Sequence, residues 1–149
     1  MFSKFLQNNP LYKECIEALK VGMLSKQEAD DVTTLFKLMV PLTRWGKVDW
    51  SKIDKKIEVG YDQNDIIPFL EGLFGGSFDT SVYVEWSMNV PSIKTDIKSI
   101  VSNYDDVACV APETFIFNPD VGYIIEILIS GQITAGLIPN YAERFLNKK

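Results

Sequence analysis

The side chains that could carry chemistry in this sequence are carboxylates and two thiols, because the chain contains no histidine. Without an imidazole there is no Ser-His-Asp triad, no Cys-His pair and no side chain whose ordinary pKa lies near neutrality. Cys15 and Cys109 cannot by themselves form a structural zinc site. Both lie in apolar segments, which predicts two buried and unreactive thiols. We therefore expect neither a metal nor a cofactor.

The carboxylates offer two candidates for acid-base chemistry. Asp105 and Asp106 are adjacent, and Glu126 stands alone in the run Tyr-Ile-Ile-Glu-Ile-Leu-Ile, where burial among aliphatic side chains would disfavour its charged form. The favoured interpretation of Glu126 is a structural glutamate that is hydrogen-bonded or faces solvent. Glycoside hydrolysis needs a cleft with two positioned carboxylates, and the short loops of this 149-residue chain do not predict one. The sequence thus predicts that the protein is not an enzyme.

The segments that precede these carboxylates have the periodicity of helices. A helix is predicted over residues 10–22, where apolar residues recur at helical spacing after Pro10. The segment Ser25-Lys-Gln-Glu28 has the spacing of a capping box and predicts the start of a second helix. This helix would end before Pro41. Its apolar stripe consists of Ala29, Val32, Phe36, Met39 and Val40. A third helix is predicted over residues 62–74.

From residue 81 the period of the sequence changes to two, which predicts a half-buried strand over residues 81–87. A helix then opens at Pro91 and Ser92. Its apolar stripe consists of Ile93, Ile97, Ile100, Val101 and Tyr104. Further strands are predicted over 107–111, 115–117, 123–129 and 132–138, followed by a short terminal helix over 141–146. The last two strands are joined at Ser130 and Gly131, a pair suited to a tight hairpin turn.

This order of elements predicts one α+β domain over residues 1–149. N-terminal helices are followed by a mainly antiparallel sheet of about five strands, with one intervening helix. The crossover through that helix leaves two arrangements open for the strand over 81–87. It either runs parallel to the next strand in sequence or lies at an edge of the sheet.

Residues 44–59 are basic and contain two tryptophans, Trp45 and Trp50. Basic residues among aromatic rings are typical of surfaces that bind single-stranded nucleic acid. The favoured interpretation is structural, because acidic residues interrupt this stretch and because the tryptophans are suited to anchor it onto the core. The acidic pI of about 4.7 also argues against nucleic acid as a partner.

The net charge of −5 is distributed unevenly along the chain. Residues 1–59 hold ten lysines or arginines and eight acidic residues, whereas residues 60–149 hold five and twelve. Between residues 60 and 139 there are two basic residues and eleven acidic ones. We therefore describe 1–59 as the helical, mildly basic portion and 60–149 as the acidic, sheet-bearing portion.

So many carboxylates on one small domain create a negative potential of several kT. Two interpretations remain open, solubility alone or attraction of a basic protein partner. An acidic surface can also imitate nucleic-acid phosphates and so cover the active site of a nuclease. The residues predicted to contact such a partner are Asp62, Asp65, Asp79, Glu85, Asp105, Asp106, Glu113, Asp120 and Tyr104.

Three segments of the C-terminal half share a recognisable pattern. They are Asp105-Asp-Val-Ala-Cys-Val-Ala-Pro-Glu-Thr-Phe, Gly122-Tyr-Ile-Ile-Glu-Ile and Gly131-Gln-Ile-Thr-Ala-Gly-Leu137. Together they resemble the immunity proteins of bacterial contact-dependent growth inhibition systems. The resemblance covers about a third of the chain and rests on a strand–turn–strand pattern with a Gly-rich final hairpin. It implies a cytoplasmic protein that binds the toxic C-terminal domain of a delivered effector. Such toxins are often basic nucleases whose active site the immunity protein covers.

The leading hypothesis is therefore an immunity protein that neutralises a cognate basic toxin without catalysis. The alternative is an acidic secretion chaperone or adaptor, which would be a dimer that binds an extended effector segment, whereas we expect a monomer. A carboxylate enzyme is the third hypothesis. The N-terminus has no secretory signal and the longest apolar run is too short for a membrane helix, so we expect a cytoplasmic location and no membrane partner.

Overall fold

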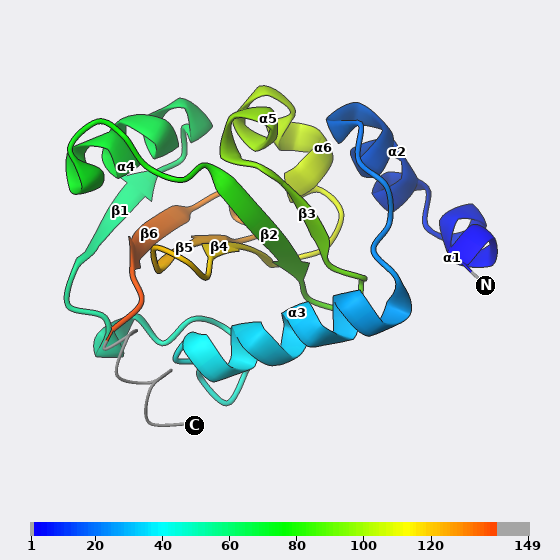
Figure 1. The fold of residues 1–149 in the computed structure, drawn as a ribbon, viewed down its shortest axis with the longest axis horizontal. Coiled ribbons are helices and arrows are strands. Elements are labelled where there is room, and N and C mark those ends of the chain that lie inside the picture. The colour runs from blue at the N-terminus through cyan, green and yellow to red at the C-terminus, as the bar shows by residue number, and fades with distance from the viewer. Residues whose placement is uncertain (1, 140–149) are drawn as a thin grey trace.

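A six-stranded, fully antiparallel sheet lies at the centre of the fold, with the strand order β1-β6-β5-β4-β2-β3. The computed structural model describes residues 2–139. The strands are β1 (Lys56–Gly60), β2 (Ser81–Trp86), β3 (Ile93–Asp96), β4 (Thr114–Asn118), β5 (Tyr123–Ile127) and β6 (Ile133–Leu137). Helices cover both faces of this sheet (Figure 1).

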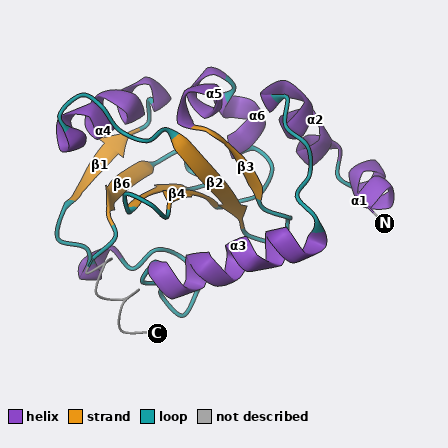
Figure 2. Cartoon of the chain, viewed as in Figure 1, coloured by secondary structure: helices purple, strands orange, loops and turns teal. Residues whose placement is uncertain are grey.

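The helices fall into two layers, which Figure 2 shows on opposite sides of the strands. The α-helices are α1 (Phe2–Asn8), α2 (Pro10–Leu19), α3 (Lys26–Met39), α4 (Ile66–Phe74), α5 (Ile97–Ser102) and α6 (Tyr104–Ala108). Two 3-10 turns, η1 (Trp50–Lys52) and η2 (Gln63–Asp65), complete the helical elements of the described residues. Helices α2, α4, α5 and α6 lie on one side, whereas α3 lies alone on the other.

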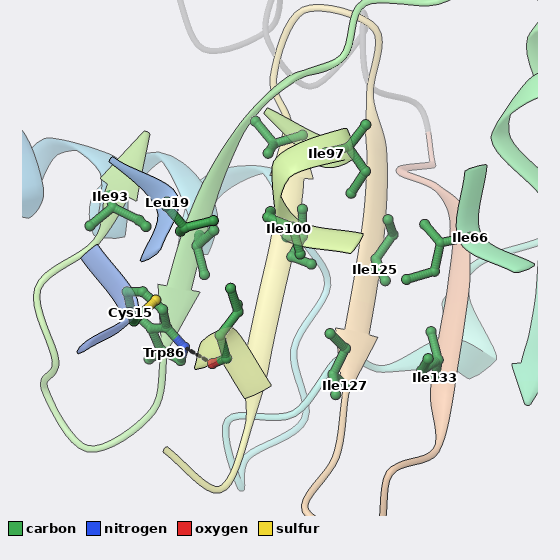
Figure 3. Close-up of a cluster of buried hydrophobic side chains, with 14 of the residues drawn as sticks. Cys15, Leu19, Ile66, Trp86, Ile93, Ile97, Ile100, Ile125, Ile127 and Ile133 are labelled. Atoms are coloured by element: carbon green, nitrogen blue, oxygen red, sulfur yellow. Dashed lines mark hydrogen bonds between the residues drawn. The ribbon is translucent and has the colours of Figure 1, made fainter. Parts of the chain in front are cut away.

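The core beneath α2, α4, α5 and α6 consists mainly of aliphatic side chains (Figure 3). Alternate residues of β2 point into it, among them Val82, Val84 and Trp86, as the period of two predicts. The Trp86 indole N–H donates to the carbonyl oxygen of Val107 in α6 at 3.1 Å. This bond satisfies the polar edge of a large buried ring, which is a usual condition for burying tryptophan.

The second core lies between the sheet and α3, and residues 40–53 complete its cover. The apolar stripe predicted for this helix is buried at all five of its positions. Phe36 packs against Phe115 and Phe117 of β4, with ring centroids 5.0 and 5.4 Å apart. Contacts at this spacing add to the gain from burying three aromatic rings.

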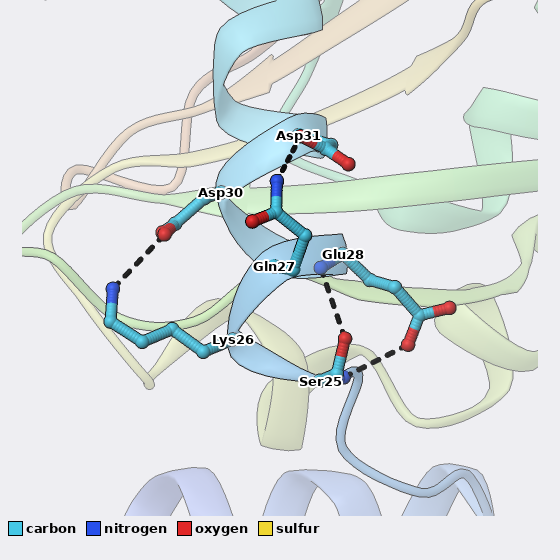
Figure 4. Close-up of polar contacts among 6 residues, drawn as sticks. All are labelled: Ser25, Lys26, Gln27, Glu28, Asp30 and Asp31. Carbon is cyan, nitrogen blue, oxygen red and sulfur yellow. Dashed lines mark hydrogen bonds and ion pairs between the residues drawn. The ribbon is translucent and has the colours of Figure 1, made fainter.

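The predicted capping box fixes the start of α3 (Figure 4). The Ser25 hydroxyl accepts from the Glu28 amide at 3.1 Å, and the Glu28 carboxylate accepts from the Ser25 amide at 3.0 Å. Both amides would otherwise lack a partner within the helix. The Ser25 hydrogen bonds lower the pKa of Glu28. The helix ends at Met39, just before Val40 and Pro41.

The final hairpin needs a glycine at residue 136. A Cβ atom added to Gly136 would lie 2.6 Å from the Lys55 carbonyl oxygen. Only a glycine therefore lets β1 and the residue before it lie so close to β6. The predicted turn at Ser130 and Gly131 is confirmed, with Gly131 at a φ of 92°.

The α+β class is confirmed, but the helix predicted to open at Pro91 is wrong in its first turn. Ile93–Asp96 forms β3, which pairs with β2, and only Ile97–Ser102 is helical. The Asp96 carboxylate accepts from the Lys98 amide at 2.8 Å and so caps α5. Ile93, Ile97 and Ile100 are all buried, as a continuous helix would also require. The apolar stripe therefore did not distinguish a strand from a helix at Ile93.

Three other predictions of secondary structure also differ. The strand predicted over 107–111 is wrong, because residues up to Ala108 belong to α6; acidic residues in its first turn favour the helix. Strand β1 and helix α1 were not predicted. Strand β1 is short and none of its five residues is buried, although Ile57 and Val59 alternate with charged residues. Neither arrangement proposed for the strand over 81–87 is correct, since β2 lies inside the sheet and has antiparallel neighbours. The terminal helix predicted over 141–146 lies outside the described residues.

Candidate partner-binding surface

Two glutamates lie in one row across the face of the sheet that α3 covers. Glu85 of β2 is opposite Phe115 of β4, and Phe115 is opposite Glu126 of β5. Side chains in such a row point to the same face. The exposed fraction of Glu85 is 8% and that of Glu126 is 4%. Two buried carboxylates therefore flank one phenylalanine.

Glu126 is held by the segment that follows α3. One carboxylate oxygen accepts from the Val48 amide at 2.8 Å, and the other accepts from the Trp50 indole N–H at 2.9 Å. The predicted structural role of Glu126 is confirmed by these bonds. Each carboxylate oxygen has an N–H donor, and the donors themselves would be unsatisfied without it. Glu126 thus ties residues 48–50 to the centre of the sheet.

Glu85 is held by hydroxyl groups. Thr33 of α3 lies 3.0 Å from both carboxylate oxygens, and Ser92 donates a third hydrogen bond. Burial raises the pKa of this carboxyl, and the hydroxyl groups and the charge of Lys37 offset only part of the effect. The exposure expected for Glu85 is wrong, because α3 covers the outer side of β2.

A groove of about 620 Å³ opens beside Glu85. It lies between α3 and the connection from β2 to β3, and residues near Trp45 close one side. Trp45 and Met88 line it and are each 76% exposed. The prediction that Trp45 anchors onto the core is therefore wrong, whereas Trp50 does so through Glu126. Neither Met88 nor Thr33 was among the predicted contact residues.

Among the predicted contact residues, Asp79 and Asp120 lie at one end of the sheet. Asn118 connects them, since its side chain donates to the Asp79 carbonyl oxygen and accepts from the Asp120 amide. The Ser81 amide lowers the pKa of the Asp79 carboxyl. Glu113 lies at the opposite end, because it precedes β4 where Thr114 pairs with Trp86. The two ends are about 20 Å apart at 3.3 Å per residue.

The remaining candidates lie in the layer formed by α2, α4, α5 and α6. Asp62 and Asp65 precede α4, and the Asp62 carboxylate accepts from the Asn64 amide. Asp105 and Asp106 begin α6. Tyr104, beside them, has a buried hydroxyl with no hydrogen-bond partner among the described residues. Burial, and then the charge of Asp105, raises the pKa of Tyr104.

Cys109 follows α6 and is exposed, which makes the prediction of two buried thiols wrong for this residue. Cys15 is buried as predicted. The raised pKa of Cys109 comes first from desolvation and then from the neighbouring charge of Asp106. The thiolate form that reacts is therefore disfavoured although the side chain is accessible.

None of the predicted acidic residues has a lysine or arginine within 4.0 Å among the side chains that the structure describes. Apart from Glu85, which is buried under α3, these residues can act on another molecule through their charges. They are distributed over both ends of the sheet and one helical layer, so a partner of ordinary size would contact a subset of them.

The described part of the chain shows no cluster of three or more metal-ligating side chains. It also contains no helix with the length and hydrophobicity needed to span a bilayer.

The model of the family described as CdiI immunity protein, EcoliA0-like, matches residues 9–136. The chain belongs to this family of immunity proteins. The CdiI match runs from the start of α2 into β6, so it includes both glutamates and the groove. A search of curated proteins found no match.

Proposed function

We propose that this CdiI-family chain binds the toxic C-terminal domain of a delivered effector and neutralises it by covering its functional surface. The observation that carries the proposal is the family match over residues 9–136. Binding alone accounts for the proposed neutralisation, so the mechanism includes no chemical step. The protein acts as a monomer in the cytoplasm of the cell that it protects.

We further propose that the toxin is a basic domain of the nuclease type. Eleven acidic residues against two basic ones between residues 60 and 139 support this proposal. The acidic candidates lack ion-pair partners among the described side chains, so their field extends into solvent. Such a field accelerates association with a cationic partner and disfavours acidic ones.

Titration of the toxin with this protein tests neutralisation without catalysis. The cognate toxin domain is held at a fixed concentration with a nucleic-acid substrate, and cleavage is measured against increasing amounts of the protein. We expect inhibition to be complete at one molecule per toxin. Complete inhibition at much lower ratios would show turnover and contradict the mechanism. An unrelated nuclease, which should stay active, is the control.

The ionic-strength dependence of binding tests the charge of the toxin. The association rate constant should fall about tenfold or more between low and high salt, because electrostatic steering is screened. A rate constant that is independent of salt would contradict a basic toxin.

Light scattering of the mixture distinguishes the chaperone alternative, which predicts a dimer of this chain bound to an extended segment.

A further inference from the structure

The groove beside Glu85 combines a buried carboxylate with an exposed apolar rim. Its floor contains Glu85 and Phe115, and its walls come from α3 and from the connection between β2 and β3. Most carboxylates of the acidic portion lie on the outer surface, where water solvates them. Glu85, which is 8% exposed, instead lies at the base of the groove.

The carboxylate of Glu85 has neutral donors only. Its hydrogen bonds come from the hydroxyls of Thr33 and Ser92. Within the described residues, no lysine or arginine lies within 4.0 Å of it. Lys37 is the cation whose charge reaches it. A buried carboxylate without a paired cation is costly to hold, and a cation that enters the groove would reduce this cost.

The rim of the groove presents two side chains of the kinds enriched at protein interfaces, tryptophan and methionine. The Arg44 guanidinium lies 4.7 Å from the centroid of the Trp45 ring and holds one side of it. Met88 and Asn89 have φ angles of 66° and 60°. Two consecutive non-glycine residues in this region store strain, which is often found at binding sites. The strained turn displays Met88 to solvent.

The charges around the groove select the kind of side chain that fits it. Lys26 and Asp30 on its wall pair with each other at 3.0 Å. The other charged residues that line the groove are one cation, Lys37, and two carboxylates, Glu85 and Glu113. An apolar side chain over Glu85 would remove water from the carboxylate and return no hydrogen bond. A guanidinium or ammonium group would return charge-assisted hydrogen bonds.

We propose that this groove receives an arginine or lysine side chain of the toxin, which pairs with Glu85 while Trp45 and Met88 pack around its stem. This inference rests on the proposed function, because it names the site where the toxin binds. In this proposal Glu85 contacts the toxin directly, whereas the other acidic residues attract it from a distance through their charges.

The test compares groove variants with matched variants elsewhere, using the full chain and a catalytically inactive toxin domain. Glu85→Gln and Trp45→Ala should each raise the Kd by about tenfold or more, measured by isothermal titration calorimetry. Glu71→Gln changes an exposed glutamate of α4, and Tyr61→Ala removes a ring that is 71% exposed. These two controls should stay within about threefold of the unaltered chain. Thermal unfolding of each variant confirms that it is folded.

A double-mutant cycle identifies the partner of Glu85. Each arginine and lysine of the toxin is changed to alanine and measured against both the unaltered chain and Glu85→Gln. One toxin residue should show effects that are not additive with Glu85→Gln. If the unaltered chain binds but the groove variants stay within about threefold of it, the groove proposal is overturned and the proposed function stands. If the unaltered chain does not bind the toxin, both are overturned.

Discussion

Glu126 and Glu85 occupy the same row of one sheet face, with Phe115 between them, yet their surroundings differ. Glu126 accepts from a backbone amide and an indole, both supplied by residues that cover it. Glu85 accepts from hydroxyls and lines an open groove. The comparison teaches that burial alone does not assign a role to a carboxylate. Its donors, and what covers it, distinguish a structural residue from a candidate for binding.

The largest expected effect is that of removing the carboxylate of Glu126, which accepts hydrogen bonds from Val48 and Trp50. Glu126→Ala should lower the free energy of unfolding by about 2–4 kcal/mol, because two buried donors lose their acceptor. Chemical denaturation measures this change. Glu58→Ala is the control, since Glu58 extends the same row into β1 but is exposed, and it should change stability by less than about 0.5 kcal/mol. Equal losses in the two variants would contradict the structural role of Glu126.

Removing one donor from each glutamate should have a smaller and unequal effect. Trp50→Phe deletes the indole donor of Glu126 and should cost about 1–2 kcal/mol of unfolding free energy. Thr33→Val deletes a hydroxyl donor of Glu85 and should cost less, because water in the groove can replace it. Urea denaturation of both variants checks the order. The distinction between the two sites fails if Thr33→Val is the more costly change.

The helix that covers Glu85 depends on its cap. Ser25→Ala should lower the free energy of unfolding by about 1 kcal/mol, because the Glu28 amide loses its acceptor. Ser25→Thr retains a hydroxyl and is the conservative control. Hydrogen exchange should accelerate in the first turn of α3, whereas the Val48 amide, which donates to Glu126, should lose protection only through global unfolding. Selective loss at Val48 would contradict this separation.

The smallest expected effect, with the opposite sign, is that of Glu85→Gln. Because the folded-state pKa of Glu85 is raised above its usual value of 4.5, the folded protein holds this proton more tightly than the unfolded chain. Stability conferred in this way is present below pH 4.5 and decreases as the pH rises towards the raised value. The unaltered chain should therefore lose stability relative to Glu85→Gln over that interval. Denaturation at several pH values measures the difference, and a gain of the unaltered chain with rising pH would contradict it.

Local signals in the sequence predicted the elements whose formation depends on neighbouring residues. The capping box at Ser25 and the turn at Gly131 were predicted correctly, because their geometry is set within four residues. The boundary between β3 and α5 was not predicted. Ile93 joins a strand because β2 provides a pairing partner for it. The spacing of the isoleucines does not show whether such a partner exists.

The candidate site was predicted only in part. Glu85 was named from the charge asymmetry, but its burial was missed because the alternation of β2 shows which residues share a face and not what covers that face. Trp45 and Met88 gave no signal of exposure, since large apolar residues are usually buried. The contribution of Thr33 comes from a helix that lies 52 residues earlier in the chain.

The sequence by itself determined the absence of imidazole chemistry, the excess of acid after residue 60 and the start of α3, because these are properties of composition or of adjacent residues. The tertiary structure decided which glutamate is enclosed and which faces a groove. The donors of Glu126 lie 76 and 78 residues away, and the Thr33 hydroxyl lies 52 residues from Glu85. Contacts over such separations arise only when the covering segments pack onto the sheet, so the packing assigns each carboxylate its environment.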